Sequence, residues 1–494
     1  MLYIRMLLSM VVSLYTSRVV LDVLGVEDYG LYGLVGGVVA MFSFLNSTMA
    51  GATSRFLTFE MGRGDQDRLK ATFSSALFIH IGIALWVLIL AETVGLWFLN
   101  NKLVIPEGRM HAAHWVLQFS VISMLVNFTQ VPYNAAIIAH EKMDVYAYVE
   151  LLNVFLKLGI VYLLSIGSFD KLILYAFLVL LVSVLIAFIY RIYCVKHYDE
   201  TKFSLHFDKQ ISKEIISFSF YNLLGNMGYI VNTQGTAFVV NKFFGLIYNA
   251  AISISTTVSG VISNFASNIM TAFRPQIMKS YACGDIDQFQ YLLSWTIKSV
   301  LFVYSLIAIP AGVLINEILS IWLVEVPIYA NVFCRLLFIN VFFETLRCII
   351  IMGVHAHGDV RLVSFCAGLA FLFNPAIVYL FYYFSFPAAY AYVSNIMWNI
   401  ILICVNILIL KHYVPSISLK LILLSILKVM IVVIFTLLLV IFAYNILTTY
   451  DFLKIILIGC ISTVLLTLLF SLLVLTKDQR ANILRCLKAK FKSR

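Results

Sequence analysis

Long apolar runs alternate with short polar segments along the whole chain. Each run has about 20 residues, the length that a helix needs to cross a hydrocarbon layer of about 30 Å. The period-2 alternation of strands is absent, so the pattern predicts helices. We predict fourteen spans, at residues 3–24, 31–54, 72–99, 112–139, 145–167, 171–193, 212–240, 245–272, 289–316, 328–353, 360–384, 387–410, 419–446 and 452–476.

The polar segments predict how these helices are oriented. Of the lysines and arginines, 23 lie on the side where the chain starts and ends, six lie on the other side and five lie within spans. Short cytoplasmic loops carry the excess of positive residues. We therefore expect both termini in the cytoplasm. The first span carries Arg18 and Asp22 and lacks a small-residue cleavage site, so we interpret it as a membrane helix and not as a signal peptide.

Composition excludes a soluble domain. Of the 494 residues 62% are hydrophobic and 12% are charged, and the mean hydropathy is +0.98. A soluble surface of this size requires more charge. The net charge of +10 comes largely from the positive-inside bias and from a basic tail at 477–494, which we expect to lie against anionic lipids and not on nucleic acid. The eight cysteines form no close pair, and we predict no disulfide, metal or cofactor.

A short polar segment between two apolar runs, here called an elbow, occurs twice along the chain at a fixed spacing. The segments MGRGDQD (Met61–Asp67) and YACGDID (Tyr281–Asp287) each follow an apolar run, and the same offset of 220 residues aligns Gly25 with Gly245. Glycine permits a tight backbone, and aspartate suits a helix cap or a hydrated turn. We expect each elbow to be a structural turn between the second and third spans of its half.

A nearby offset of 217 residues extends this repeat into later spans. It aligns the dipeptide AH at 139 with AH at 356, and IVYL at 160 with IVYL at 377. Each half then has six spans, and because six is even, both halves enter the membrane from the same side as parallel repeats. We predict an all-α polytopic protein with four parts: six-helix bundles at 1–200 and 201–412, two accessory helices at 413–476 and a cytoplasmic tail at 477–494. Such twofold construction is typical of transporters.

Two segments resemble the O-antigen type of polysaccharide-biosynthesis flippase. They are LYIRMLLSMVVSLYTSRVVLDVLGVEDYGLYGLVGGVVAMFSFLNSTMAGATSRFLTFEMGRGD (2–65) and VPYNAAIIAHEKMDVYAYVELLNVFLKLGIVYLL (131–164). That family belongs to the multidrug/oligosaccharidyl-lipid/polysaccharide exporter superfamily, which also holds the lipid II flippase. The resemblance implies a V-shaped pair of six-helix bundles in a bacterial inner membrane. It also implies transfer of an undecaprenyl-diphosphate-linked oligosaccharide to the periplasmic leaflet, with membrane lipids, a polysaccharide polymerase and glycosyltransferases as partners.

A diphosphate that crosses an apolar layer needs cationic and hydrogen-bonding groups in a shielded cavity. The lipid II flippase has arginines in span 1 and at the inner ends of spans 2 and 8 that serve its diphosphate. The resemblance implies the same role for Arg18, Arg55 and Arg274. Alternatively, Arg18 pairs with Asp22 at i, i+4, and the other two are positive-inside anchors.

Further candidates follow from the residues themselves. Lys157 in the middle of span 5 and Lys298 in span 9 are costly to bury, so we expect them to line a hydrated cavity. Glu344 and Arg347, three residues apart in span 10, are predicted to form a structural pair. Span 7 has a polar face suited to sugar hydroxyls, formed by Tyr221, Asn222, Asn226, Asn232 and Gln234.

Two other functions stay open at this point. A drug or organic-cation exporter of the same fold would share the hydropathy and the repeat. A membrane enzyme such as a polysaccharide polymerase needs a sizeable outer loop or a histidine and acid cluster in the membrane, and the longest outer loop here, around 97–111, is short. The sequence contains no Walker motif, so ATP is not the direct energy source. We predict a transporter and not an enzyme.

Overall fold

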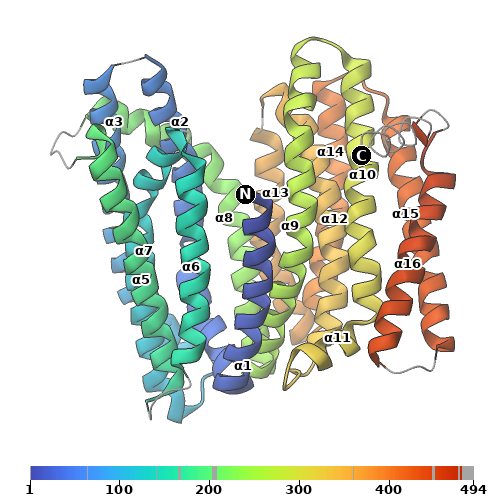
Figure 1. Cartoon of the computed structure of the whole chain (residues 1–494), viewed down its shortest axis with the longest axis horizontal. Helices are drawn as coiled ribbons and strands as arrows, with labels where there is room; N and C mark the ends of the chain where they lie inside the picture. Colours follow the sequence, from blue (N-terminus) through green and yellow to red (C-terminus); the bar gives the residue numbers. More distant parts are fainter. Residues whose placement is uncertain are drawn as a thin grey trace, which may run out of the picture. The chain divides into compact units, whose positions relative to one another are not determined.

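The computed structural model of the protein describes residues 2–63, 65–140, 142–164, 169–202, 208–359, 361–447, 451–476 and 479–480. Within these ranges the fold is all-α, with no strand (Figure 1). The helices are α1 (Leu2–Ala40), α2 (Ser43–Arg63), α3 (Gln66–Leu90), α4 (Leu96–Asn101), α5 (Met110–Ala139), α6 (Met143–Leu163), α7 (Lys171–His197), α8 (Lys209–Phe244), α9 (Leu246–Ala282), α10 (Ile286–Val313), α11 (Ile315–Trp322), α12 (Ala330–His357), α13 (Arg361–Tyr383), α14 (Tyr390–Tyr413), α15 (Leu419–Ile446) and α16 (Asp451–Leu473). A π-helical turn (Ala91–Gly95) joins α3 to α4, and 3₁₀ turns lie at Glu107–Arg109 and Asp199–Thr201.

The prediction of a polytopic helical membrane protein is confirmed. In the described part of the chain, twelve helical stretches are long and apolar enough to cross a membrane. The long helices α2 and α8 are not among the twelve, and that they also cross stays a prediction. Pro132, Pro310 and Pro375 lie inside α5, α10 and α13, as their positions within apolar runs predict.

Two glycines of the repeat have the same unusual backbone. Gly25 interrupts α1 with φ 79° and ψ 168°, and Gly245 separates α8 from α9 with φ 81° and ψ −171°. Side chains other than hydrogen are strongly disfavoured in this region, so glycine is required at both sites. The alignment of Gly25 with Gly245 is therefore confirmed as a shared chain turn.

The elbows are turns and caps, as expected. Asp65 caps α3 by accepting a hydrogen bond from the Arg68 amide at 3.0 Å, and Asp285 caps α10 through the Gln288 amide at 2.9 Å. Gly284 has φ 74°, whereas its repeat mate Gly64 lies outside the described residues. Each cap satisfies an amide at the start of a helix that would otherwise lack a partner.

The chain divides into two compact units. Unit 1 comprises Met1–Thr257, Leu323–Ala330 and Ser364–Ser394, and unit 2 comprises Val258–Trp322, Asn331–Val363 and Asn395–Arg494. The four parts predicted from the repeat stay a prediction, and most of the tail at 477–494 lies outside the described residues.

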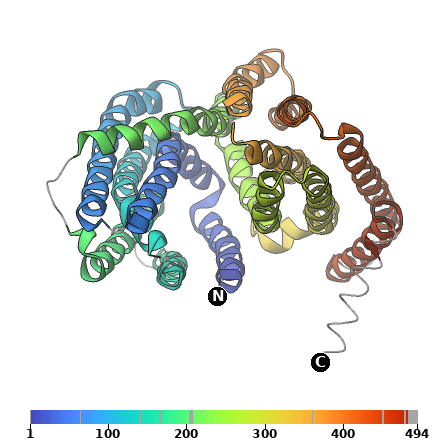
Figure 2. The ribbon, with the colours of Figure 1, turned by 90° about the horizontal axis from the view of Figure 1, so that it is seen from above.

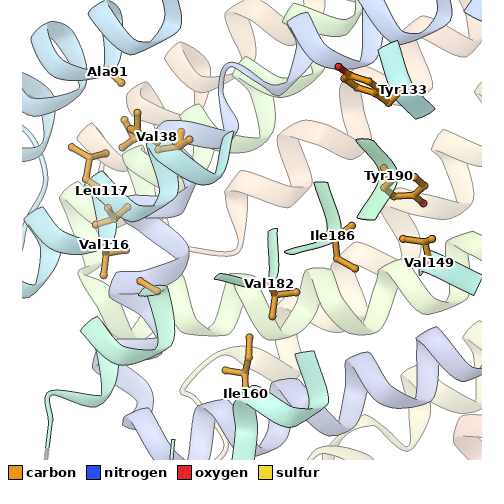
Figure 3. Packing of buried hydrophobic residues seen from close by; sticks show 14 of the residues in the cluster. Val38, Ala91, Val116, Leu117, Tyr133, Val149, Ile160, Val182, Ile186 and Tyr190 are labelled. Atoms are coloured by element: carbon orange, nitrogen blue, oxygen red, sulfur yellow. The ribbon is translucent and has the colours of Figure 1, made fainter. Parts of the chain in front are cut away.

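Each unit has its own packing. An apolar cluster in unit 1 joins the first helices, and Figure 3 shows Val38 of α1, Leu117 of α5, Val149 and Ile160 of α6 and Tyr190 of α7 within it. In unit 2 the accessory helices α15 and α16 lie side by side, and both pack against α10 (Figures 1 and 2).

Candidate functional site

Lys157 is a cation on a membrane helix that has no acidic partner in the described part of the chain. Its side chain is exposed on α6, and no acidic side chain among the described residues forms an ion pair with it. Glu150, nearly two turns earlier on the same helix, accepts a hydrogen bond from the Tyr190 hydroxyl at 3.5 Å. The nearest acid on α6 is therefore engaged elsewhere.

Arg18 is a second cation of the same kind. It is half-buried on α1, and within the ranges that the structure describes it has no acidic partner; the alternative pair with Asp22 does not form. Helix α1 packs against α6, and the side chains of Tyr15 and Tyr162 interact across this contact. Arg18 and Lys157 thus lie on neighbouring helices of unit 1.

Glycines on α1 allow a polar side chain to approach it closely. A Cβ added at Gly37 would lie 2.5 Å from Oε1 of Gln234 on α8, and one added at Gly30 would lie 2.3 Å from the carbonyl oxygen of Leu246. The neighbour of Gly30 is backbone and cannot move easily, so this glycine permits close helix contact, whereas the end of the Gln234 side chain could shift away from a larger residue at position 37. Gln234 is half-buried at this contact. The side chains of Arg55, Asn222 and Asn226 lie outside the described residues.

The candidate cations of unit 2 have different surroundings. Arg274 is exposed on α9, and its charge acts on Cys348 and His355 of α12. Lys298 is only 9% exposed on α10, and the like charge of Lys428 on α15 acts on it. The two candidates therefore lie on separate faces of the unit, one toward α12 and one toward α15.

The predicted pair of Glu344 and Arg347 is part of a larger network. The two charges interact, but the Arg347 Nε donates to Oδ1 of Asn399 at 2.9 Å. Asn399 in turn donates to Oδ1 of Asn340 at 3.1 Å. Amides on α14 and α12 therefore hold the buried guanidinium, and sequence analysis identified only its acidic neighbour.

An ion cluster around the turn at Glu107–Arg109 was missed by sequence analysis. Arg109 donates to both carboxylate oxygens of Asp28, one at 2.7 Å, and to Oδ2 of Asp170 at 2.7 Å. The hydrogen bonds to Asp28 raise the pKa of Arg109, partial burial opposes the shift, and the charges of both carboxylates add to it. Asp170 also caps α7. Arg109 is thus fully paired, in contrast to Arg18 and Lys157, and only the three-dimensional arrangement distinguishes them.

A buried amide chain joins α8 to α13 and α14 in unit 1. Asn374 donates to Oδ1 of Asn232 at 2.7 Å, and the Ser394 hydroxyl donates to Oδ1 of Asn374. Beside it, a Cβ at Gly228 would lie 2.6 Å from the carbonyl oxygen of Gly368. The signal in the sequence is an asparagine within an apolar run, which by itself predicts no partner.

Both halves contain a histidine stacked on a tyrosine. His140 lies 3.9 Å from the Tyr198 ring at an interplanar angle of 5°, and His357 lies 4.5 Å from Tyr413 at 15°. The two histidines are the repeat mates of the AH dipeptides. The repeat therefore extends from the sequence to a specific tertiary contact.

Within the described residues, no group of three His, Cys, Asp or Glu is arranged to hold a metal ion. The candidate site consists instead of fixed positive charges and amides. Such groups bind anions and sugar hydroxyls without covalent chemistry.

Comparison with known proteins identifies the fold. No family model matches the chain. It is 21% identical over 324 residues to an uncharacterized membrane protein EpsK of Bacillus subtilis (strain 168); the match covers 64% of this chain and 63% of that protein's length, so the chain spans less than two thirds of this relative. Its fold is similar to the lipid II flippase MurJ in an inward closed conformation, with a TM-score of 0.70, 16% identity and coverage of 95% of this chain and 98% of that one. It is also similar to an inward-facing multidrug resistance MATE family transporter of the MOP superfamily, with a TM-score of 0.66, 12% identity and coverage of 83% and 96%.

Proposed function

We propose that the protein is a flippase in a bacterial inner membrane. Its substrate is an undecaprenyl-diphosphate-linked oligosaccharide that moves from the cytoplasmic to the periplasmic leaflet for surface polysaccharide synthesis of the O-antigen or capsule type. Polysaccharide polymerases and glycosyltransferases are the partners that such a substrate implies.

One observation carries this proposal: Arg18 and Lys157 lie on neighbouring helices without acidic partners among the described residues. A charge within a membrane span costs at least about 2.5 kcal/mol by insertion scales. Because of this cost, a cation without an acidic partner in a span usually has a functional role. A diphosphate that arrives with the substrate would supply the missing anion, and water would suffice between transport cycles. Arg55 and Arg274 are proposed to bind the same diphosphate, and Asn222, Asn226 and Gln234 the attached sugars.

Lys298 contributes less to this proposal. Its amine is buried and faces the like charge of Lys428, which leaves little room for a bulky headgroup. We include it only as a long-range positive charge.

Transport and not catalysis is supported by the fold. The two solved structures with a similar fold are a lipid II flippase and a multidrug resistance transporter. A multidrug exporter would bind hydrophobic cations, and they are repelled by a site with two positive charges that lack acidic partners among the described residues. This charge favours the flippase over the exporter.

The test is leaflet transfer in reconstituted liposomes. An undecaprenyl-diphosphate-linked oligosaccharide is placed in one leaflet, and its exposure to a membrane-impermeant sugar-modifying enzyme is followed with time. A fluorescent hydrophobic cation serves as the competing substrate. Transfer of the oligosaccharide lipid alone supports the proposal, whereas export of the cation alone overturns it in favour of a drug exporter.

A further inference from the structure

An apolar groove lies between α10, α12 and α15 in unit 2. Its volume is about 580 Å³. Most of its lining is aliphatic or aromatic, including Ile309, Val313, Phe338, Phe342, Val433 and Leu437. The lining side chains Ile339 and Ile434 are 45% and 53% exposed, so the groove opens to the surroundings of the protein.

The groove is shorter than the full hydrocarbon layer of a membrane. On α10 it runs from Tyr304 near the middle of the helix to Val313 at its end, and on α12 from Arg335 near the start to Phe343 near the middle. At 1.5 Å per residue these stretches measure about 12 to 14 Å, and the lining of α15 from Met430 to Asn445 measures about 22 Å. The groove is thus shorter than a hydrocarbon layer of about 30 Å. One acyl chain fits this length, while an undecaprenyl chain is several times longer.

Arg335 lies at the outer mouth of the groove. Its Nε donates to the carbonyl oxygen of Gly312 at 3.1 Å, which fixes the plane of the guanidinium. No acidic side chain in the described part of the chain pairs with it. The two terminal nitrogens therefore keep donors for a phosphate, which guanidinium groups bind through parallel hydrogen bonds.

The acid nearest to this end of the groove has its own partners. Glu317 of α11 accepts a hydrogen bond from the Tyr444 hydroxyl and lies 3.9 Å from the Lys454 amine. Lys454 also lies 3.6 Å from the centre of the Tyr444 ring. This contact ties α15 and α16 to α11 and leaves the charge of Arg335 uncompensated.

We propose that this groove holds an anionic phospholipid of the surrounding bilayer. The lipid phosphate binds the terminal nitrogens of Arg335, and one acyl chain lies between α10 and α15. An apolar channel with a single cation at its leaflet surface matches this amphiphile in length, polarity and charge. The bound lipid fills the contact between the accessory helices and the rest of unit 2. This inference is independent of what the protein transports.

The experiment measures lipid binding to the purified full-length protein by native mass spectrometry. Phosphatidylglycerol is titrated into detergent-solubilised protein, with phosphatidylcholine as the zwitterionic comparison. Arg335→Gln should weaken phosphatidylglycerol binding about tenfold, as expected for the loss of a charge-assisted phosphate contact. Arg335→Lys keeps the charge and should bind within about threefold of the unaltered protein.

A second variant tests the groove with the charge left in place. Ala308 lines the groove, and Ala308→Phe would fill it and should remove phosphatidylglycerol binding while Arg335 remains. The control is Lys242→Gln, an exposed cation at the end of α8 that contacts Tyr379 and should leave binding unchanged.

Three results would overturn the proposal. Arg335→Gln and Ala308→Phe could both bind phosphatidylglycerol like the unaltered protein. Phosphatidylcholine could bind as tightly as phosphatidylglycerol with no effect of Arg335. Undecaprenyl phosphate could displace phosphatidylglycerol and lose its own binding in Ala308→Phe, which would assign the groove to the lipid carrier.

Discussion

His140 in the first half and His357 in the second half each stack on a tyrosine, but their hydrogen-bond partners differ. Nε2 of His140 lies 2.5 Å from Oε1 of Glu200, which is only 6% exposed. Nδ1 of His357 lies 2.8 Å from the Tyr281 hydroxyl. The ring stack is common to both halves. The histidine of the first half contacts a carboxylate, and the histidine of the second half contacts a neutral hydroxyl.

The lysines within spans also have different surroundings, although they are not repeat mates: the offset of 217 residues aligns Lys157 with Asn374. Lys157 in the first half is exposed without an acidic partner among the described residues, and Lys298 in the second half is buried beside the charge of Lys428. Because the position that matches Lys157 carries Asn374, the repeat fixes backbone turns and aromatic packing more strictly than charge. This is expected, because a turn or a stack tolerates few alternatives, while a charge at the same depth can serve either substrate or packing.

The largest expected effect separates the two lysines by function. Lys157→Gln should abolish transfer of the oligosaccharide lipid at normal protein level, and Lys157→Arg should retain part of it because the charge is kept and the geometry is not. Lys298→Met removes a span lysine of the other half that is not its repeat mate, and it should leave transfer nearly intact. The measurement is initial transfer rate in liposomes, normalised to protein. Full activity of Lys157→Gln would remove the main support for an anionic substrate.

The two turn glycines should respond alike. Gly25→Ala and Gly245→Ala force alanine into a backbone region that costs about 1 to 3 kcal/mol, and no neighbouring atom lies within 4 Å of either added Cβ. Each change should lower the free energy of unfolding in detergent by about 2 kcal/mol. Gly82→Ala and Gly260→Ala are controls, one in each half, because both glycines are helical with open space around the added Cβ. Unequal losses at Gly25 and Gly245 would contradict the equivalence of the turns.

The histidine contacts should differ in strength. Glu200→Gln removes a buried charged acceptor and should cost about 1.5 kcal/mol, while Tyr281→Phe removes a neutral exposed partner and should cost about 0.5 to 1 kcal/mol. Denaturant unfolding of the purified variants compares the two. Equal costs would show that the charge of Glu200 adds nothing to the stack.

The helix caps should produce the smallest effect. Asp65→Ala and Asp285→Ala each remove one cap and should cost about 1 kcal/mol with no change in substrate choice. Thermal unfolding measures the loss of stability, and the transfer assay with both substrates measures substrate choice. Selective loss of transfer at normal stability would instead make the elbows part of a gate.

Much of the fold follows from the sequence because its determinants are local. Apolar runs of sufficient length fix the helices, and the glycines at 25 and 245 and the aspartates at 65 and 285 fix turns and caps within a few residues of themselves. The repeat also related distant parts of the chain, because residues at matching positions of the two halves are expected to make similar contacts.

The candidate site was less predictable because pairing is not local. Arg109, Arg18 and Arg335 are all arginines in or next to a predicted span, yet Arg109 has two carboxylate partners, while the described residues give the other two none. Those carboxylates lie 81 and 61 residues away from Arg109. Likewise, nothing near Asn374 in the chain indicates that Asn232, 142 residues earlier, accepts its hydrogen bond.

The contact between Asn232 and Asn374 also determines when unit 1 can complete its folding during synthesis. Unit 1 includes Ser364–Ser394, so it is incomplete when Thr257 leaves the ribosome. At about 5 to 20 residues per second, the segment up to Ser394 appears about 7 to 27 s later. During that interval α8 carries the close-contact surface of Gly228 and the amide of Asn232 without the helix that covers them. Unit 1 therefore cannot complete its folding before residues 364–394 are synthesised. The rate of translation sets the earliest time at which this can happen.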